Sequence, residues 1–403
     1  MRTVLVTGLG GAGRTTVAAA TAHAAAKRDE RVLFLSTGPG EVLGTPVTGR
    51  PDAPEEITDG LWAGRVDTGA DFRAEFLSLQ ERSAAALDLL GAARLEEAEL
   101  TELPGSEQFA LLRALTVAAS GDWDTVVVDL PPLRETIALL VLPEQLRRYL
   151  RRLLPQERQA ARALRPVLAQ LAGVPMPAQW LYATAARWDA ELALVQSVIE
   201  SGDTALRVVA EPGPAAAAAL RTARSGLALH GLRVEALLAN RVLPRHSADT
   251  WLASLAAQQE KCLHEWSQEW PPGTALLEVP HAGRDPRGLA DLALLGDLSL
   301  PDSGGSQDGA DAGADRGSPG QRIEDRRTDD GILVWTLDLP GAVKGDVGLV
   351  RRGDELLLTV GPFRRILPLP SVLRRCTVAG AALADGVLRV RFAPDPQLWP
   401  RGH

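Results

Sequence analysis

The sequence contains little lysine, little cysteine and no long apolar run, and each scarcity narrows the possible classes of protein. Only three of the 43 basic residues are lysine, so arginine supplies nearly all of the positive charge. The net charge of −8 argues against a general nucleic-acid binder, which usually has a clustered basic excess. The two cysteines, Cys262 and Cys376, lie far apart and indicate neither a disulfide framework nor a Cys-x-x-Cys metal clip.

The chain also has no stretch of about 18 apolar residues, which argues against an integral membrane segment. Met1 and Arg2 lead directly into a short β-branched run rather than into a secretory signal peptide. We therefore expect a cytoplasmic protein. With 403 residues, of which 45% are hydrophobic, the chain is long enough for two or three globular domains.

A glycine-rich segment near the N-terminus is the most informative motif. Residues 3–7 (TVLVT) favour a strand, residues 8–16 read GLGGAGRTT, and residues 17–26 favour a helix because they are rich in alanine. Strand, glycine loop and helix in this order are typical of a phosphate-binding P-loop, where backbone N–H groups point at an anion. Arg14 stands at the position where the P-loop pattern has lysine. A simple tight turn without a ligand is the alternative interpretation.

Short apolar runs alternate with helical stretches over residues 1–300 and predict a doubly wound, mostly parallel α/β sheet. Two leucine-rich segments, approximately residues 72–118 and 143–200, interrupt this alternation, and we expect them to form a helical subdomain. The strand candidates are residues 31–36, 125–129, 206–210, 235–240 and 275–279.

The composition changes after residue 300. Residues 301–330 are dominated by Ser, Gly, Asp and Arg and predict a disordered linker. Residues 331–395 contain short runs of period two separated by tight-turn signals, which predict a small all-β sandwich. Residues 396–403 are expected to be a tail.

Several motifs in order make residues 1–300 similar to the arsenical-pump ATPase family, which includes the ATPases that deliver tail-anchored membrane proteins. The glycine loop resembles the family's GKGGVGKTT. Residues 36–43 (STGPGEVL) stand in place of the first switch, and residues 129–140 (DLPPLRETIALL) stand in place of the second. Residues 103–107 (LPGSE) and 238–242 (LANRV) resemble two further family segments, the second of them on the adenine side.

This resemblance implies a P-loop NTPase that binds ATP together with Mg²⁺. Thr15 and Asp129 would hold the metal through the bound nucleotide. The residues that the resemblance assigns to nucleotide binding are Gly8, Gly10, Gly11, Ala12, Gly13, Arg14, Thr15, Thr16, Asn240 and Pro280.

The departures from the family pattern fall on catalytic positions. Arg14 and Leu9 replace two lysines, one for the bound nucleotide and one that reaches the partner subunit's phosphates in a dimer. Gly38 replaces the aspartate associated with the attacking water, and residues 133–135 (LRE) replace a Thr-Gly-His segment. Because phosphoryl transfer depends on positioning and charge stabilisation, we expect hydrolysis to be absent or very slow. No residue is therefore predicted to be catalytic.

The C-terminal region resembles the α-crystallin domain of small heat-shock proteins. Residues 337–341 (LDLPG) resemble its opening motif, and residues 381–388 (AALADGVL) resemble its closing motif. Some relatives of the targeting ATPases carry the same appendage, so the two resemblances support each other.

Two functions remain open at this point. The first is an ATP-binding protein or pseudo-ATPase with degenerate motifs that acts as a client-binding chaperone or targeting factor. The second is an active MgATP-hydrolysing ATPase of the same family, in targeting or anion transport. An arsenite role has little support because the two cysteines do not form a thiol cluster in the sequence. The resemblance implies a homodimer, a hydrophobic protein client and transient association with membranes or membrane proteins. The net charge argues against a nucleic-acid partner.

Overall fold

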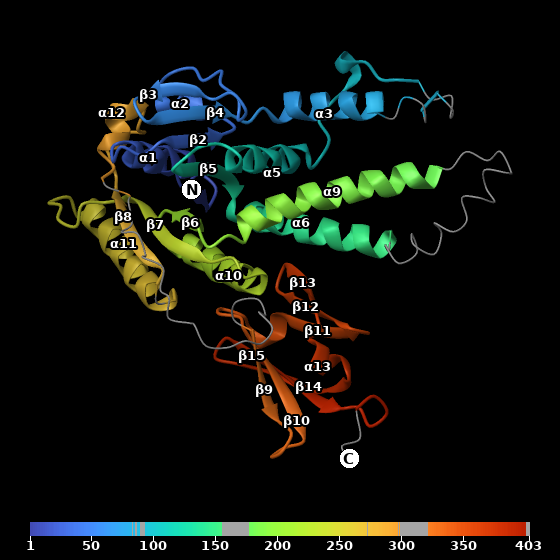
Figure 1. Cartoon of the computed structure of the whole chain (residues 1–403). Coiled ribbons are helices and arrows are strands. Elements are labelled where there is room, and N and C mark those ends of the chain that lie inside the picture. Colours follow the sequence, from blue (N-terminus) through green and yellow to red (C-terminus); the bar gives the residue numbers. More distant parts are fainter. Residues whose placement is uncertain are drawn as a thin grey trace. The chain divides into compact units, whose positions relative to one another are not determined.

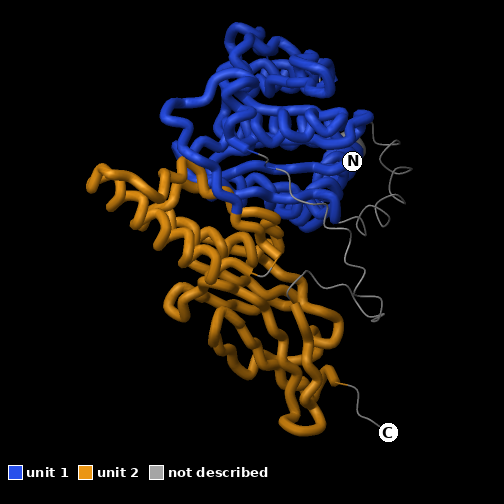
Figure 2. Tube along the Cα trace, turned by 90° about the vertical axis from the view of Figure 1, so that its left-hand side faces the viewer, with its two compact units in different colours: residues 1–209, 277–299 blue, residues 210–276, 300–403 orange. Residues whose placement is uncertain are grey.

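The computed structural model describes residues 1–82, 84, 87, 88, 93–154, 177–271, 273–296, 298 and 321–399. The chain divides into two compact units (Figure 2). The first comprises residues 1–209 and 277–299, and the second comprises residues 210–276 and 300–403. This division differs from the expected boundary near residue 300, because residues 210–276 group with the C-terminal region.

A large sheet is built from the apolar runs of the N-terminal three quarters of the chain. Its strands are β1 (Arg2–Gly8), β2 (Val32–Ser36), β3 (Glu55–Thr58), β4 (Leu61–Arg65), β5 (Thr125–Pro132), β6 (Thr204–Ala210), β7 (Val234–Val242) and β8 (Ala275–Pro280). The strand order is β3-β4-β2-β5-β1-β6-β7-β8. β1 is parallel to β5 and β6, β2 is parallel to β4 and β5, and β3 is antiparallel to β4. The predicted mostly parallel α/β sheet is confirmed.

The strand β1 lies in the interior of this sheet, which explains its nearly continuous apolar sequence. Val4 is 2% exposed and pairs with Val127 on one side and Ala205 on the other. Gly8, at the carboxyl end of β1, pairs with Val209 of β6. The sheet therefore delivers the glycine loop at its carboxyl edge.

Helices of the first unit include four long ones that lie side by side, α3 (Thr68–Arg82), α5 (Ser106–Ala119), α6 (Leu133–Leu153) and α9 (Pro177–Ile199) (Figure 1). They fall largely in the segments where a helical subdomain is expected, although α6 already begins at Leu133, directly after β5. The intervening residues 155–176 lie outside the described part of the chain. The remaining helices of this unit are α1 (Arg14–Ala26), α2 (Pro39–Leu43), η1 (Glu97–Glu99) and α12 (Gly288–Ala293). Within the described residues, no helix has both the length and the apolar character needed to cross a membrane.

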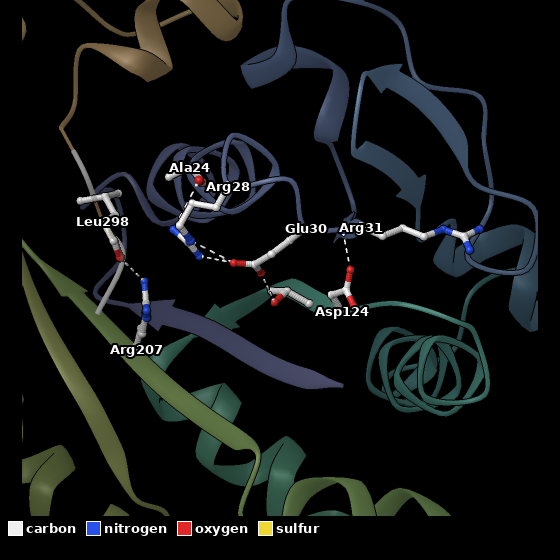
Figure 3. Close-up of polar contacts among 8 residues, drawn as sticks. Ala24, Arg28, Glu30, Arg31, Asp124, Arg207 and Leu298 are labelled. Carbon is white, nitrogen blue, oxygen red and sulfur yellow. Dashed lines mark hydrogen bonds and ion pairs between the residues drawn. The ribbon is translucent and has the colours of Figure 1, made fainter. Parts of the chain in front are cut away.

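Polar contacts between segments far apart in sequence hold the strands beside β1 (Figure 3). Glu30 accepts hydrogen bonds from the Thr125 hydroxyl at 2.6 Å and from Arg28 at 2.6 and 2.9 Å. Arg207 on β6 is only 2% exposed, and its guanidinium donates to the Leu298 carbonyl at 2.7 Å. The segment that follows α12 is thus attached to the interior of the sheet.

The second unit contains α10 (Pro214–His230), α11 (Thr250–Glu269) and a β-sandwich. One sheet of the sandwich has the order β14-β15-β10-β9 and the other has the order β11-β12-β13. The neighbouring strands in both sheets pair antiparallel, and Trp335 on β10 and Phe392 on β15 are buried. The elements are β9 (Gln321–Arg326), β10 (Ile332–Asp338), η2 (Lys344–Asp346), β11 (Val347–Arg352), β12 (Glu355–Val360), β13 (Phe363–Pro368), α13 (Ser371–Arg374), β14 (Cys376–Ala384) and β15 (Val387–Pro394). The predicted all-β domain is confirmed.

The strand β9 corrects the sequence-based description of the linker. Its residues lie within the segment 301–330 that we expected to be disordered, yet they pair with β10, with Ile323 opposite Trp335. The prediction of disorder is therefore wrong for Gln321–Arg326. An edge strand needs only backbone partners on one side, so its charged side chains remain in water. Residues 301–320 lie outside the described residues.

Candidate nucleotide-binding site

The glycine loop connects β1 to α1, and its path depends on residues without a side chain. A Cβ at Gly8 would lie 2.1 Å from the Val209 carbonyl oxygen, which also accepts a hydrogen bond from the Leu9 N–H at 2.9 Å. Gly13, the residue before α1, has a φ of 83°, in the left-handed region that favours glycine. The two ends of the loop are therefore fixed by backbone geometry.

The first turn of α1 is open to an anion. No side chain caps α1, and its first turn contains no acidic residue. Gly10 and Gly11 are exposed, and a Cβ at either position would meet no atom within 4 Å. Because the first N–H groups of a helix have no partner inside the helix, they and the positive end of the helix dipole favour a phosphate. The loop has the geometry of a phosphate cradle.

Asp129 on β5 lies below this cradle, together with two hydroxyl groups. Its Oδ2 accepts hydrogen bonds from Thr15 Oγ1 at 2.7 Å and Ser36 Oγ at 3.0 Å. Its Oδ1 is buried and accepts no hydrogen bond from the described residues. Burial raises the pKa of Asp129, whereas the Thr15 hydrogen bond, the Arg14 charge and the Ser36 hydrogen bond oppose this shift.

This donor set fits Mg²⁺ that arrives with a nucleotide. A carboxylate with an unsatisfied oxygen beside two hydroxyls offers the hard oxygen ligands that Mg²⁺ prefers, and Mg²⁺ usually retains waters and phosphates for its other positions. The described residues contain no group of three or more His, Cys, Asp or Glu side chains that could hold a metal without such help. Thr15 and Asp129 are the residues that would contribute.

Comparisons with known proteins agree with this arrangement. The family model described as "Anion-transporting ATPase" matches residues 1–299, and the model described as "HSP20-like domain found in ArsA" matches residues 330–392. The chain belongs to the anion-transporting ATPase family. Both resemblances drawn from the sequence, to the arsenical-pump ATPases and to the α-crystallin domain, are thereby confirmed.

Relatives of this ATPase homologue share its full length. An uncharacterised protein of Streptomyces coelicolor is 55% identical over 407 residues, with all of both chains covered. A Mycobacterium tuberculosis protein is 32% identical and covers 99% of this chain and 97% of its own. An Aquifex aeolicus protein named arsenical pump-driving ATPase 1 is 25% identical and covers 93% of this chain and 95% of its own.

Against the family pattern of this ATPase homologue, Arg14 is the notable residue of the loop. Its guanidinium donates a hydrogen bond to the Leu130 carbonyl, next to Asp129 on β5. Arginine presents a rigid planar fork, whereas the lysine of the family pattern is a compact point charge on a flexible stem. Arg14 therefore joins α1 to the second switch segment through a charged hydrogen-bond donor.

The two switch segments lack the groups that the family pattern places there. Gly38 precedes α2, its N–H donates to Ser36 Oγ at 3.2 Å, and a Cβ there would meet open space. In the second switch Leu133 is buried, while Arg134 and Glu135 are exposed at the start of α6. The hydroxyls of Thr7 and Thr136 lie 2.9 Å apart, each 2.7 Å from the Pro131 carbonyl oxygen, and fix the turn. These contacts fix the turn at the second switch, and the first switch has no carboxylate at position 38.

The other residues assigned to nucleotide binding are divided between the units. The first unit contains residues 8–16, Asp129 and the exposed Pro280, whereas the buried Asn240 belongs to the second. The structure thus brings Thr15 and Asp129 together within the first unit, and it adds Ser36. We did not assign Ser36 to the site, although its position at the carboxyl end of a strand was a usable signal.

Proposed function

We propose that this protein binds MgATP with the glycine loop, hydrolyses it very slowly or not at all, and acts as a client-binding chaperone or targeting factor. The observation that carries the proposal is the contrast around Asp129. The Thr15–Asp129 pair below the loop is kept, whereas positions 9, 14 and 38 lack the lysines and the aspartate of the family pattern.

Binding is supported by the uncapped first turn of α1, the open space at Gly10 and Gly11, and the unsatisfied Asp129 Oδ1. Members of this family use ATP and Mg²⁺. When bound, Mg²⁺ would supply positive charge that neutralises the nucleotide phosphates. Thr15 and Asp129 would hold and orient it, and the loop N–H groups would bind the phosphate oxygens.

Loss of hydrolysis is supported by the missing charges. The transition state of phosphoryl transfer is loose, with little bonding to the attacking water, so catalysis rests on positioning that water and on cations that stabilise the phosphoryl charge. Leu9 offers no charge to a partner subunit, and Gly38 offers no carboxylate to orient water. Each such group typically contributes a large factor in rate, so two losses together leave little turnover.

Client binding is supported by apolar side chains on the long helices of the first unit. Phe109, Tyr149, Leu153, Trp188 and Leu194 are each at least 44% exposed. Contiguous patches of exposed apolar side chains mark protein-interaction surfaces, and these five side chains lie on three helices that pack against one another. We propose that this surface takes a hydrophobic protein segment or the second subunit of a homodimer. Because Leu9 carries no charge, assembly should respond little to ATP.

The test measures nucleotide affinity and turnover on the same preparations. We expect the full chain to bind a fluorescent ATP analogue more tightly with Mg²⁺ than with EDTA, and Asp129→Asn to lose about 10- to 100-fold of that Mg²⁺-dependent affinity. Glu135→Gln, an exposed change on the same switch segment, is the matched control. Phosphate release should stay at background, also in Arg14→Lys. No binding to the wild type would refute the proposal.

The alternative, an active MgATP-hydrolysing ATPase of the family, predicts a different result in the same assay. Steady phosphate release that disappears in Asp129→Asn but persists in Glu135→Gln would establish it. An ATP-driven change from monomer to dimer, measured by light scattering, would further support this alternative.

A further inference from the structure

Arginine side chains gather on the outer face of one sheet of the HSP20-like domain, the sheet β14-β15-β10-β9. Leu388, Val390 and Phe392 of β15 are each at most 2% exposed, so they point into the sandwich. Because successive side chains of a strand point to opposite faces, Arg389 and Arg391 lie on the outer face, where both are exposed. Their backbones are about 7 Å apart along the strand.

The pairing of β10 with its two neighbours extends this face. Thr336 of β10 lies opposite Arg389 of β15 on one side and opposite Arg322 of the edge strand β9 on the other. Residues directly opposite in antiparallel strands share a face, so these three side chains form one row across the sheet. With neighbouring strands about 4.8 Å apart, the backbones of the two arginines lie about 10 Å apart, with a hydroxyl group between them.

The edge strand β14 leaves room for the arginines of β15. Gly380 pairs with Arg391, and a Cβ at residue 380 would lie 2.8 Å from Arg391 Nη2. The Arg391 guanidinium therefore lies across β14, in the space that a larger residue would fill. Ala382, the next outward residue of β14, pairs with Arg389 and is also small. No bulky side chain of these two positions covers the guanidinium groups.

The carboxylates of this face do not balance its arginines. By the alternation of side chains, Glu324 of β9 and Asp338 of β10 point outward. Glu324 forms an ion pair with Arg326 at 2.7 Å. The three other arginines of the face form no ion pair within the part of the chain that the structure describes. The face thus has an excess of positive charge.

The chemistry of the face favours a partner that carries carboxylates. Residues 321–403 contain 13 basic and 10 acidic residues, in a chain whose net charge is −8. The planar fork of arginine binds a carboxylate through two parallel hydrogen bonds. Alternate residues of an extended peptide are about 7 Å apart, which equals the spacing of Arg389 and Arg391 along β15. An extended peptide that lies along β15 therefore brings one carboxylate to each arginine.

A lipid surface and a nucleic acid fit this face less well. Recognition of anionic lipids typically uses clusters of about four to eight basic residues, more than the face offers. Proteins that bind single-stranded nucleic acids stack the bases on aromatic side chains. The outward positions of β9, β10, β14 and β15 hold no aromatic residue.

We propose that this outer face binds an extended acidic segment of a protein partner, with carboxylates at alternate residues. The face consists of Arg322, Thr336, Arg389 and Arg391. The two arginines of β15 each bind one carboxylate, and Arg322 adds attraction from the other side of Thr336. The surface lies on different elements from the apolar helices of the first unit and requires no nucleotide, so the inference does not depend on the proposed function.

The test measures binding of fluorescein-labelled peptides to the full chain by fluorescence anisotropy. One peptide has glutamate and threonine in strict alternation, and the other has the same composition with its glutamates in one block. For Arg389→Gln/Arg391→Gln we expect about fivefold weaker binding of the alternating peptide. The matched control, Arg352→Gln/Arg364→Gln, removes the same charge from exposed positions of the other sheet and should bind nearly as the wild type does.

Asp338→Asn should have the opposite effect, because it removes an outward carboxylate two residues from Thr336 on β10. We expect about twofold tighter binding, a gain that loss of folding does not produce. The proposal is refuted if the Arg389/Arg391 variant binds as the control variant does, or if the block peptide binds as tightly as the alternating one. Capture of the chain by phosphatidylserine vesicles without binding of either peptide would overturn it in favour of a lipid surface.

Discussion

The glycine loop and the contact between α10 and Phe363 of the HSP20-like domain use glycine in two different ways. At Gly8 the glycine backbone faces another backbone, and the neighbouring Gly10 and Gly11 border open space. At Gly226 the glycine faces an aromatic ring, and the space is filled. Open space beside a glycine suits reversible binding of a ligand. A glycine covered by an aromatic ring suits close packing between parts of the same chain.

The two regions also differ in how they treat a buried titratable group. Asp129 has one carboxylate oxygen that accepts no hydrogen bond from the part of the chain that the structure describes, and its other oxygen accepts from two hydroxyls that suit a cation. His230 has a buried Nδ1 that makes no hydrogen bond to the described residues, and the nearby Arg365 guanidinium disfavours a second positive charge. The surroundings of Asp129 thus favour binding of a cation, whereas the surroundings of His230 disfavour its protonation.

The largest expected effect comes from Gly8→Ala. Its Cβ would meet the Val209 carbonyl at a distance that no relaxation of one side chain relieves, so β1 and β6 must separate locally. We expect a loss of about 4 kcal/mol in stability of the first unit, together with loss of nucleotide binding. Urea unfolding followed by circular dichroism measures it. Gly10→Ala, in open space, should unfold as the wild type does, and equal midpoints for both variants would contradict the backbone argument.

Phe363→Ala tests the contact between the Phe363 ring and Gly226 of α10. Removing a buried aromatic ring typically costs about 3 kcal/mol or more, and here the cavity lies directly on α10. We expect the second unit to unfold at lower urea concentration while the first unit keeps its midpoint. Ile323→Ala, on the exposed edge strand β9, is the control. If the contact between Phe363 and α10 is only incidental, Phe363→Ala and Ile323→Ala should lower the urea midpoint of the second unit equally.

Acidification should weaken the second unit through His230. Burial and the Arg365 charge lower the pKa of His230 from 6.5 to about 4. Above pH 6.5 the residue is neutral in both states and has no effect. As the pH falls from 6.5 toward 4 the unfolded state binds a proton that the folded state does not, so stability declines, by at most about 3 kcal/mol.

Urea unfolding midpoints measured between pH 7 and pH 4 give the slope of stability against pH and so test this decline. His230→Asn should flatten it, because the variant has no group to titrate at this position. His264→Asn changes an exposed histidine and should leave the slope as in the wild type. A slope that survives in His230→Asn would assign the pH dependence to other groups.

The smallest expected effect is a gain in stability from Asp129→Asn. Burial raises the pKa of Asp129, so the ionised carboxylate disfavours the folded state at neutral pH. Removing the charge should stabilise the ligand-free chain, a gain that shrinks as the pH falls through the raised pKa. MgATP should then stabilise the wild type more than the variant. Asp122→Asn, at the surface, should show neither effect.

Part of this architecture was predictable from the sequence because it depends on local patterns. The apolar run at the start of the chain predicts β1, and the glycine loop predicts the start of α1. The hydrogen bond between Ser36 and Asp129 was not predictable locally, since it joins residues 93 positions apart through the pairing of β2 with β5. The strand β9 was missed because an edge strand needs no apolar pattern.

The contact between Gly226 and Phe363 shows a further limit of sequence reasoning. Gly226 lies in a helix rich in alanine, where one glycine reads as a mild weakness rather than as a contact point. The glycine is explained only by the fold, which places the Phe363 ring, 137 residues later in the chain, where a Cβ of residue 226 would lie. Resemblance to known motifs helped at the loop, where spacing is local, and gave no information about this long-range fit.

The attachment of Leu298 to Arg207 determines how the first unit would bear mechanical load. Tension applied to the chain beyond Leu298 reaches the sheet at a buried guanidinium on β6, directly beside β1 at Val6. Because this attachment is one side-chain hydrogen bond, whereas β1 pairs with β6 along its length, traction from the C-terminal side would release Leu298 from Arg207 before it separated the two strands.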